Sequence, residues 1–249
     1  MTIDWRAALR FVTHQPHWQR RVALGGLFML VMPPVGWMFA LGYRSLVGNR
    51  FVDGQHPFLP SWRGHFGLIA RRGAASSGVI LVYLAPFVVM YWLLGVRSWD
   101  LLLTHWREIG RFVAAVVIFP PVALPLLPPL YAARYEWLQF SPIEMALLIV
   151  LFFAPIAMLP AAFLQVAHHR RFGAAFNVRA AARLIARAPR AYVEGWIVSL
   201  AVSAAAVVIL PLAPWLLFWS YLSISHVFLQ VFAHASANGA NIRVLSSEF

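Results

Sequence analysis

Five long apolar runs, each containing proline, constrain the fold of this chain more than any other feature. They span residues 22–43, 78–94, 112–133, 145–166 and 196–232. A helix that crosses a bilayer needs roughly 20 apolar residues. Each of the first four runs therefore fits one span. The fifth is long enough for two, with an expected break between Pro211 and Pro214.

The overall composition places these runs in a membrane. Of the 249 residues, 61% are hydrophobic and 11% are charged, whereas soluble domains have roughly 45–50% apolar and about 25% charged residues. A soluble protein of this size has to present a polar surface to water. The sequence therefore predicts an all-α polytopic integral membrane helical bundle. We expect one membrane domain over 1–249, made of an interfacial N-terminal helix (1–21), a first half (22–95), a Pro-rich middle (96–141), a second half (142–232) and a polar tail (233–249).

The prolines predict that some apolar segments are not plain straight spans. Each proline removes a backbone donor and clashes with the preceding helical turn, and in lipid the freed carbonyl groups need other partners. The run 112–133 holds five prolines. We expect it either to pack inside the bundle or to be re-entrant.

The distribution of arginine gives an expected topology. Every basic residue is an arginine, and the arginines concentrate before residue 22, in 44–72 and in 167–194. Basic segments favour the cytoplasmic side, so all three are expected there. Single crossings cannot achieve this, whereas two Pro-broken hairpins, at Pro33-Pro34 and within 112–133, can. The alternative is single crossings throughout, with one basic segment outside.

A short internal repeat is compatible with a duplicated chain. The tetrapeptide Leu-Ile-Ala-Arg occurs at 68–71 and again at 184–187, and each copy follows a basic stretch and precedes an apolar run. Duplicated halves are common in transporter folds. Matches of this length also arise by chance in a chain rich in Ala, Leu and Arg, so duplication and coincidence both stay open.

Two segments have the pattern of amphipathic helices that lie on a bilayer surface. Residues 2–19 combine aromatic anchors with arginines one turn apart, and residues 177–190 place arginines opposite an aliphatic face, with Asn177 as a cap. The second segment is a candidate docking face for anionic lipid headgroups or an acidic partner. Alternatively, its arginines act only as a topology signal. They are Arg179, Arg183, Arg187 and Arg190.

The segment 54–62 reads as a rigid loop with aromatic residues, since Pro57 and Pro60 restrict its backbone. We expect Phe58 and Trp62 either to dock a ligand or partner or to seat the loop at the membrane interface.

Histidine is the residue type in the apolar runs that has the chemistry of a cofactor ligand. A buried His226 is able to ligate haem or the magnesium of chlorophyll, or to relay protons. The alternative is a hydrogen bond to serine or to a backbone carbonyl between helices.

Patterns typical of catalysis or metal binding are missing from the sequence. Cysteine is absent, which excludes disulfides, iron–sulfur clusters and Cys-based zinc sites. Phosphate loops and hydrolase motifs do not occur, and no carboxylate lies deep in an apolar run, where ion-coupled transporters usually carry one. We therefore expect no enzyme activity, no catalytic residue, no metal and, most simply, no cofactor.

Several short motifs resemble those of a known family. They are Gly42-Tyr43, Asp53-Gly54, Leu59-Pro60-Ser61-Trp62, the Phe-Gly-Ala-Ala-Phe segment at 172–176, Tyr192, and His226 with Gln230. In these motifs the chain is similar, over most of its length, to an uncharacterised prokaryotic membrane family, the domain of unknown function family four-zero-one-three. The resemblance implies a compact multi-span helical fold and supplies no known activity or catalytic residue. The proline load of 112–133 departs from the family's pattern.

Together these features predict a non-enzymatic subunit that scaffolds or stabilises a larger membrane complex, of respiratory or photosynthetic type. The alternative is a permease-like component that moves lipid or a small hydrophobic solute. The expected location is a prokaryotic inner membrane with the basic loops cytoplasmic. The expected partners are the bilayer, its anionic headgroups and other membrane subunits. Nucleic acid is not expected, because the arginines flank apolar runs and form no basic stripe interleaved with exposed aromatics.

Overall fold

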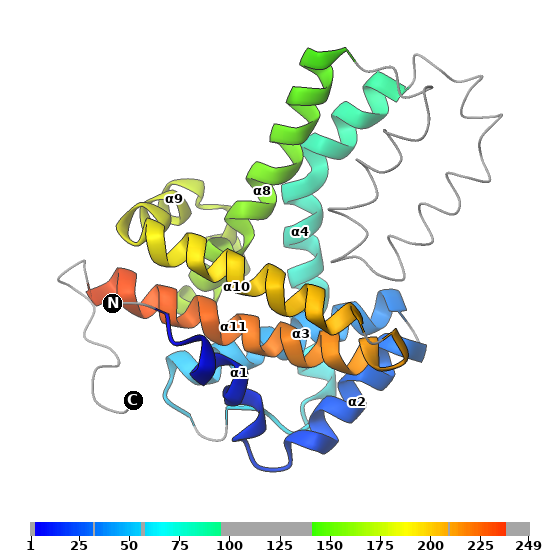
Figure 1. Ribbon diagram of the computed structural model, residues 1–249, viewed down its shortest axis with the longest axis vertical. Coiled ribbons are helices and arrows are strands. Elements are labelled where there is room, and N and C mark those ends of the chain that lie inside the picture. The colour runs from blue at the N-terminus through cyan, green and yellow to red at the C-terminus, as the bar shows by residue number, and fades with distance from the viewer. Residues whose placement is uncertain (1–2, 32, 56–57, 96–140, 209, 238–249) are drawn as a thin grey trace. The chain divides into compact units, whose positions relative to one another are not determined.

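The computed structural model describes residues 3–31, 33–55, 58–95, 141–208 and 210–237 (Figure 1). Within these ranges the regular structure is helical, with eight α-helices and no strand, so the all-α prediction is confirmed. The predicted run 112–133 lies outside the described residues. The chain divides into two compact units, the first Met1–Val79 with Met158–Phe249 and the second Ile80–Ala157. The expectation of one membrane domain stays a prediction.

The first unit begins with a helix that is shorter than the predicted 2–19 segment. Helix α1 covers Trp5–Thr13, and the Asp4 carboxylate caps it by accepting from the backbone N–H of Ala7 at 2.9 Å. Its residues Ala8, Phe11 and Val12 are buried, and α1 packs against helix α11 (Ala213–Ala237). The apolar face of α1 is therefore covered by protein, while Trp5 stays about half exposed.

The apolar run predicted at 22–43 is divided between two helices that pack on each other. Helix α2 (Trp18–Val31) ends just before the proline pair, and α3 (Pro33–Val52) begins at it. Proline suits the first turn of a helix, where its missing N–H would have no partner. The helix break at Pro33-Pro34 is thus confirmed, whereas a re-entrant hairpin stays a prediction. Helix α3 also extends well beyond the run, so Arg44 and Arg50 lie on a helix rather than in the predicted basic loop.

Helices α3 and α4 (Phe66–Gly95) cross closely in the first unit because glycine stands at the crossing. A Cβ atom on Gly42 would collide with the backbone carbonyl of Ile69, and one on Gly73 with the carbonyl of Met38. Backbones approach this closely only where side chains are absent. This crossing brings the polar side chains of α3 and α4 next to each other.

Helix α11 is the central element of the first unit and packs against α10, α2, α1 and α3. Helix α10 (Pro189–Val208) runs beside it (Figure 1), and the short turn η3 (Leu210–Leu212) separates the two. The predicted break of the run 196–232 near Pro211 and Pro214 is therefore present. Side chains with less than 2% exposure on α11 include Phe218, Leu222 and Phe228.

The second unit contains the later part of α4 and the earlier part of α8 (Pro142–His169). The rings of Phe87 and Phe152 join the two helices, with centroids 5.0 Å apart. A capping box starts α8: the Ser141 N–H donates to the Glu144 carboxylate at 2.8 Å, and the Glu144 N–H donates to the Ser141 hydroxyl at 3.3 Å. The helices continue through Pro86 and Pro155 without a break.

Three helices of the described chain are long and apolar enough to cross a membrane. They are Phe66–Met90 in α4, Pro142–His169 in α8 and Ala213–Ala233 in α11. The chain is accordingly a helical membrane protein. The two Leu-Ile-Ala-Arg copies lie near the start of α4 and at the end of the short helix α9 (Val178–Arg187). They occupy different positions in unlike helices, and internal duplication stays a prediction.

Candidate functional site

The predicted cofactor ligand His226 lies in an aromatic pocket of the first unit. Its ring stacks on Phe11 at 4.6 Å between centroids and meets Phe51 edge-on at 5.5 Å. The Gln230 side-chain amide lies 3.2 Å from its Nδ1 and also bonds to the backbone N–H and carbonyl of Asp4, at 3.0 and 3.1 Å. His226 and Gln230 thus connect α11 to α1 and α3. This arrangement favours the hydrogen-bonding role over the cofactor role, and a haem or chlorophyll ligand stays a prediction.

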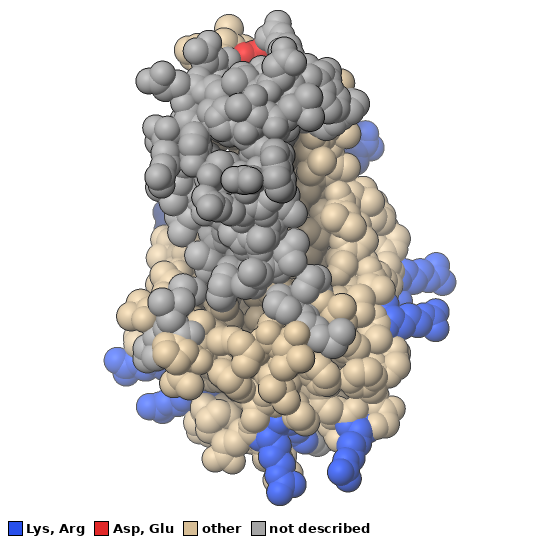
Figure 2. Space-filling view, turned by 90° about the vertical axis from the view of Figure 1, so that its right-hand side faces the viewer, with Lys and Arg blue, Asp and Glu red and all other residues tan. Residues whose placement is uncertain are grey.

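The predicted arginine face lies on α9 and on the start of α10. Asn177 caps α9, because its side chain accepts from the Ala180 N–H at 3.0 Å. The helix ends at Arg187 rather than at 190, since Pro189 begins α10 and carries Arg190 with it. Ala181 and Leu184 are buried, and the four arginines, Arg179, Arg183, Arg187 and Arg190, are exposed. Figure 2 views the right-hand side of Figure 1, away from α9, and there too the visible charged side chains are almost all basic.

The structure places the two predicted docking aromatics inside the first unit. Trp62 is 7% exposed, stacks on Tyr43 with centroids 4.7 Å apart, and donates to the Arg21 carbonyl at 3.1 Å. Phe58 is half-buried between Phe11 and Phe51. The aromatic residues of the 54–62 segment therefore contribute to the core, and the loop offers no Trp62 surface for docking. The sequence could not reveal this, because the stacking partners come from distant segments.

Tyr43 fastens the same loop to α3. Its hydroxyl donates to the Pro60 carbonyl at 2.7 Å, and both residues are buried. Burial raises the pKa of the Tyr43 hydroxyl well above its ordinary range, so the group stays protonated and able to donate.

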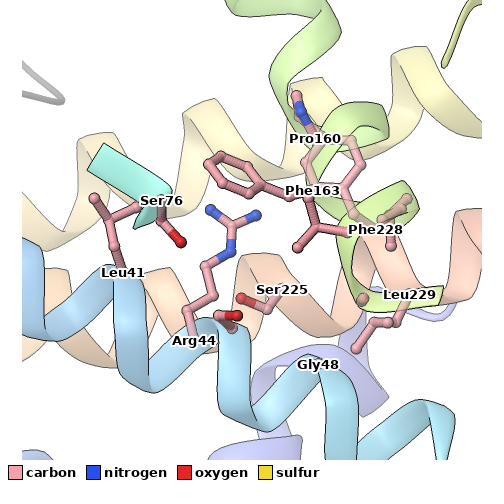
Figure 3. A pocket seen from close by; sticks show the side chains of 13 residues that line it. Leu41, Arg44, Gly48, Ser76, Pro160, Phe163, Ser225, Phe228 and Leu229 are labelled. Atoms are coloured by element: carbon pink, nitrogen blue, oxygen red, sulfur yellow. The ribbon is translucent and has the colours of Figure 1, made fainter. Parts of the chain in front are cut away.

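A small cavity with one cationic side chain lies among α3, α4, α8 and α11. Its volume is about 50 Å³, which is room for several water-sized groups. All of its lining residues belong to the first unit. The polar lining residues are Arg44, Ser45, Ser76 and Ser225, and the larger apolar ones are Leu41, Pro160, Phe163, Leu164, Phe228 and Leu229 (Figure 3).

Arg44 is held in this cavity by aromatic rings. Its guanidinium carbon lies 4.6 Å from the centroid of Tyr221 and 5.9 Å from that of Phe163. Cation–π contacts of this kind engage the face of the guanidinium. The five N–H donors project from its edge, so stacking leaves them available for hydrogen bonding.

Neighbouring arginines of the first unit have polar partners. Arg170 forms an ion pair with Asp53. With the Asn49 amide oxygen turned toward Arg72, that oxygen accepts from both terminal nitrogens of Arg72, at 2.5 and 3.1 Å. Arg44 contrasts with these two. Within the described ranges its guanidinium contacts the faces of two aromatic rings and has no polar partner.

No pattern in the sequence predicts this cavity. Arg44, Ser76 and Ser225 come from three helices, and no spacing along the chain relates them. One feature of the sequence points to Arg44, because this residue directly follows the apolar run 22–43. In the structure it lies within α3. Among the described residues, no group of three His, Cys, Asp or Glu side chains lies close enough to hold a metal ion.

Comparison with known proteins places the chain in a family. No curated protein and no solved structure matches it. A match to the family described as "Protein of unknown function (DUF4013)" extends over residues 25–218, which is well over half of the chain and includes the cavity residues Arg44 and Ser76. The resemblance drawn from the short motifs is confirmed, and the chain belongs to the DUF4013 family of proteins of unknown function.

Proposed function

We propose that this protein is a non-enzymatic integral membrane subunit that stabilises a larger membrane assembly by packing its helices against those of a partner protein. The observation that supports this is an exposed face of α8 that carries both large and small apolar side chains. The large residues are Ile143, Leu147, Val150 and Phe153, and the small ones are Ala146, Ala154 and Ala157.

These seven positions lie on a single helix face, since each is three or four residues from another member of the set. All are exposed, and Ile143 is 81% exposed. Small residues let transmembrane helices approach closely and are enriched where such helices pack. Acyl chains need no such surface, because they adapt to any contour. The face is thus better suited to another helix than to lipid alone.

Helix α10 carries a second face of the same kind in the first unit. Its exposed side chains include Val193, Ile197, Leu200 and Val208 together with Ala201 and Ala204. Exposed apolar surface of this extent marks a membrane or protein contact. A subunit with two such faces is able to join two neighbours in one membrane.

The bilayer and its anionic headgroups are the further partners we propose. Arg179 and Arg183 are exposed on α9, beside Phe176 and Val178, which are also exposed. Arginine binds phosphate through its forked donors, and apolar neighbours anchor a helix at the headgroup level. The cytoplasmic side of a prokaryotic inner membrane fits this chemistry, because its anionic lipids attract basic segments.

A permease-like role in moving lipid or a small hydrophobic solute is the second candidate, and the cavity around Arg44 favours it. Reconstituted liposomes separate the two roles. Movement of a labelled phospholipid above that of empty liposomes would support the permease, and no movement would leave the subunit role in place.

The subunit role is tested by extracting the tagged protein from its native membrane in mild detergent and identifying what accompanies it by mass spectrometry. We expect stoichiometric partners, of respiratory or photosynthetic type. Ala154→Leu should release them, since a larger side chain blocks close helix approach. Ala186→Leu, at an exposed alanine of α9 outside this face, should keep them.

A protein that is recovered alone, or that keeps its partners in Ala154→Leu, contradicts the proposal. An absorption spectrum of the same sample tests the cofactor prediction. We propose that no cofactor is bound, so a haem or chlorin band that is lost in His226→Leu would overturn that part.

A further inference from the structure

Apart from the subunit role, we propose that the cavity around Arg44 binds one oxyanion, a carboxylate or phosphate group, whose two ligands are the guanidinium of Arg44 and the hydroxyl of Ser76. The inference goes beyond the proposed function and does not depend on it. It rests on the arrangement of charge, unpartnered donors and apolar walls inside the first unit.

The positive charge of Arg44 has no opposite charge beside it among the described residues, and the residue is only partly exposed. A cation removed from water is costly unless an opposite charge or hydrogen bonds compensate it. The two rings that hold it leave the edge donors unused. An oxyanion in the cavity supplies the missing charge and can accept two parallel N–H bonds.

Ser76 is 1% exposed, and its hydroxyl has no hydrogen-bond partner. Serines in helices usually donate to a carbonyl of the preceding turn. Ser199 and Ser225 follow this pattern, with bonds of 2.6 Å to Gly195 and 2.9 Å to Tyr221. A buried hydroxyl without a partner is rare and points to a missing ligand or water.

The two donors converge. Figure 3 shows the Ser76 hydroxyl and the Arg44 guanidinium directed toward the same space between α3 and α4. Ser225 already donates to Tyr221, so its hydroxyl proton is engaged and it offers an acceptor. The lining has one cation, Arg44, and its other polar side chains are neutral serines, which fits a singly charged group.

The walls indicate what the oxyanion is attached to. Phe163, Leu164, Phe228 and Leu229 line the cavity beside the polar residues. The cavity of about 50 Å³ has room for a head group alone, so an apolar wall next to a single cation suits an amphiphile whose head lies on Arg44 and whose chain continues outside the cavity. A free anion such as inorganic phosphate would offer the same oxyanion to Arg44 and Ser76. The two sources are distinguished by whether an acyl chain adds to the affinity.

The experiment measures binding to the full-length protein in neutral detergent micelles, with detergent held constant. The probes are oleate, its uncharged counterpart oleyl alcohol, and inorganic phosphate. We expect oleate to bind and oleyl alcohol to bind far more weakly. Arg44→Gln should weaken oleate binding by about tenfold or more, as expected for a hydrogen bond to a charged group. Ser76→Ala should weaken it by a smaller factor.

Matched variants distinguish the effect of the forked Arg44 donors from the effect of losing one positive charge. Arg71→Gln removes an exposed arginine of α4 that does not line the cavity, and it should bind oleate like the wild type. Arg44→Lys keeps a cation but loses the forked donors, and it should fall between wild type and Arg44→Gln. Phosphate that competes with oleate at equal affinity would support an oxyanion site filled by a free anion.

Two results overturn the proposal. One is equal affinity for oleate and oleyl alcohol, and the other is the same loss of affinity in Arg71→Gln and Arg44→Gln. Should Arg44→Gln fail to fold, Ser76→Ala decides the question, because its isosteric change leaves the ring contacts in place. Unchanged oleate binding in Ser76→Ala would then refute the site.

Discussion

Helices α8 and α11 are both candidate spans, yet the more apolar one is the less buried. The best 18-residue window of α8 has a mean hydropathy of 2.6 and is 33% buried, whereas that of α11 has 1.5 and is 67% buried. A soluble protein would show the opposite order, since its most apolar helix fills the core. The reversed order shows that protein covers most of α11, whereas the apolar surface of α8 stays exposed and suits a bilayer or a partner helix.

The polar side chains of α11 explain its position. Gln230 bonds to His226 and to the backbone of Asp4 at the start of α1, whereas Ser220 and Ser225 donate to carbonyls of α11 itself. Lipid offers no partner for the Gln230 and His226 side chains, so a helix that carries them is stable only where protein supplies the partners. Helix α8 has no such requirement over Met145–Ala157, where every side chain is apolar, and its apolar faces can meet acyl chains or another helix.

The largest effect is expected from a cavity in the covered region. Phe218 of α11 is fully buried against Tyr43 and Trp62. Phe218→Ala should lower the free energy of unfolding by about 3–5 kcal/mol, the usual cost for a buried phenyl ring. Phe153→Ala, on the exposed face of α8, should change it by less than about 1 kcal/mol. Equal losses in reversible denaturation in mixed micelles would contradict the difference between the helices.

A charge placed on the exposed apolar face of α8 gives the next largest effect. Val150 of α8 is 59% exposed. Val150→Arg should destabilise the protein by about 2.5–3.5 kcal/mol, the insertion cost of arginine near the centre of a span. Val178→Arg, at the exposed start of α9, should stay within about 0.5 kcal/mol. The midpoints of thermal unfolding provide the measurement, and a harmless Val150→Arg would show that this face is in contact with water.

Loss of a polar partner inside the first unit should have a smaller and local effect. Gln230→Ala removes the bonds to Asp4 and to the buried His226, so we expect a loss of about 1–3 kcal/mol. Hydrogen exchange of the α1 amides should accelerate, because Gln230 holds the start of that helix to α11. Gln19→Ala, on the exposed side of α2, serves as the control and should leave exchange in α1 unchanged.

Local patterns in the sequence predict the elements better than they predict the site. The Asn177 cap, the break near Pro211 and the proline-pair boundary between α2 and α3 depend on neighbouring residues, and all three are present in the structure. The burial of Trp62 depends on Tyr43 and Phe218. The cavity depends on Arg44 meeting α4 and α11 in space. Contacts between distant segments leave no periodic trace in a single sequence.

The smallest effects are expected at the helix caps. They should differ between the short helix α9 and the long apolar helix α8. Ser141→Ala and Asn177→Ala each remove a side-chain cap worth about 1 kcal/mol. Helix α9 has only 10 residues, below the length at which helices are stable alone, so Asn177→Ala should speed amide exchange along all of it. Helix α8 has 28 residues and a surface that lipid favours. In Ser141→Ala only its first turn should exchange faster, because backbone bonds deeper in a membrane have no water to exchange with. Faster exchange throughout α8 would mean that its long apolar stretch is not shielded by a bilayer, and the contrast with α11 would then need another cause.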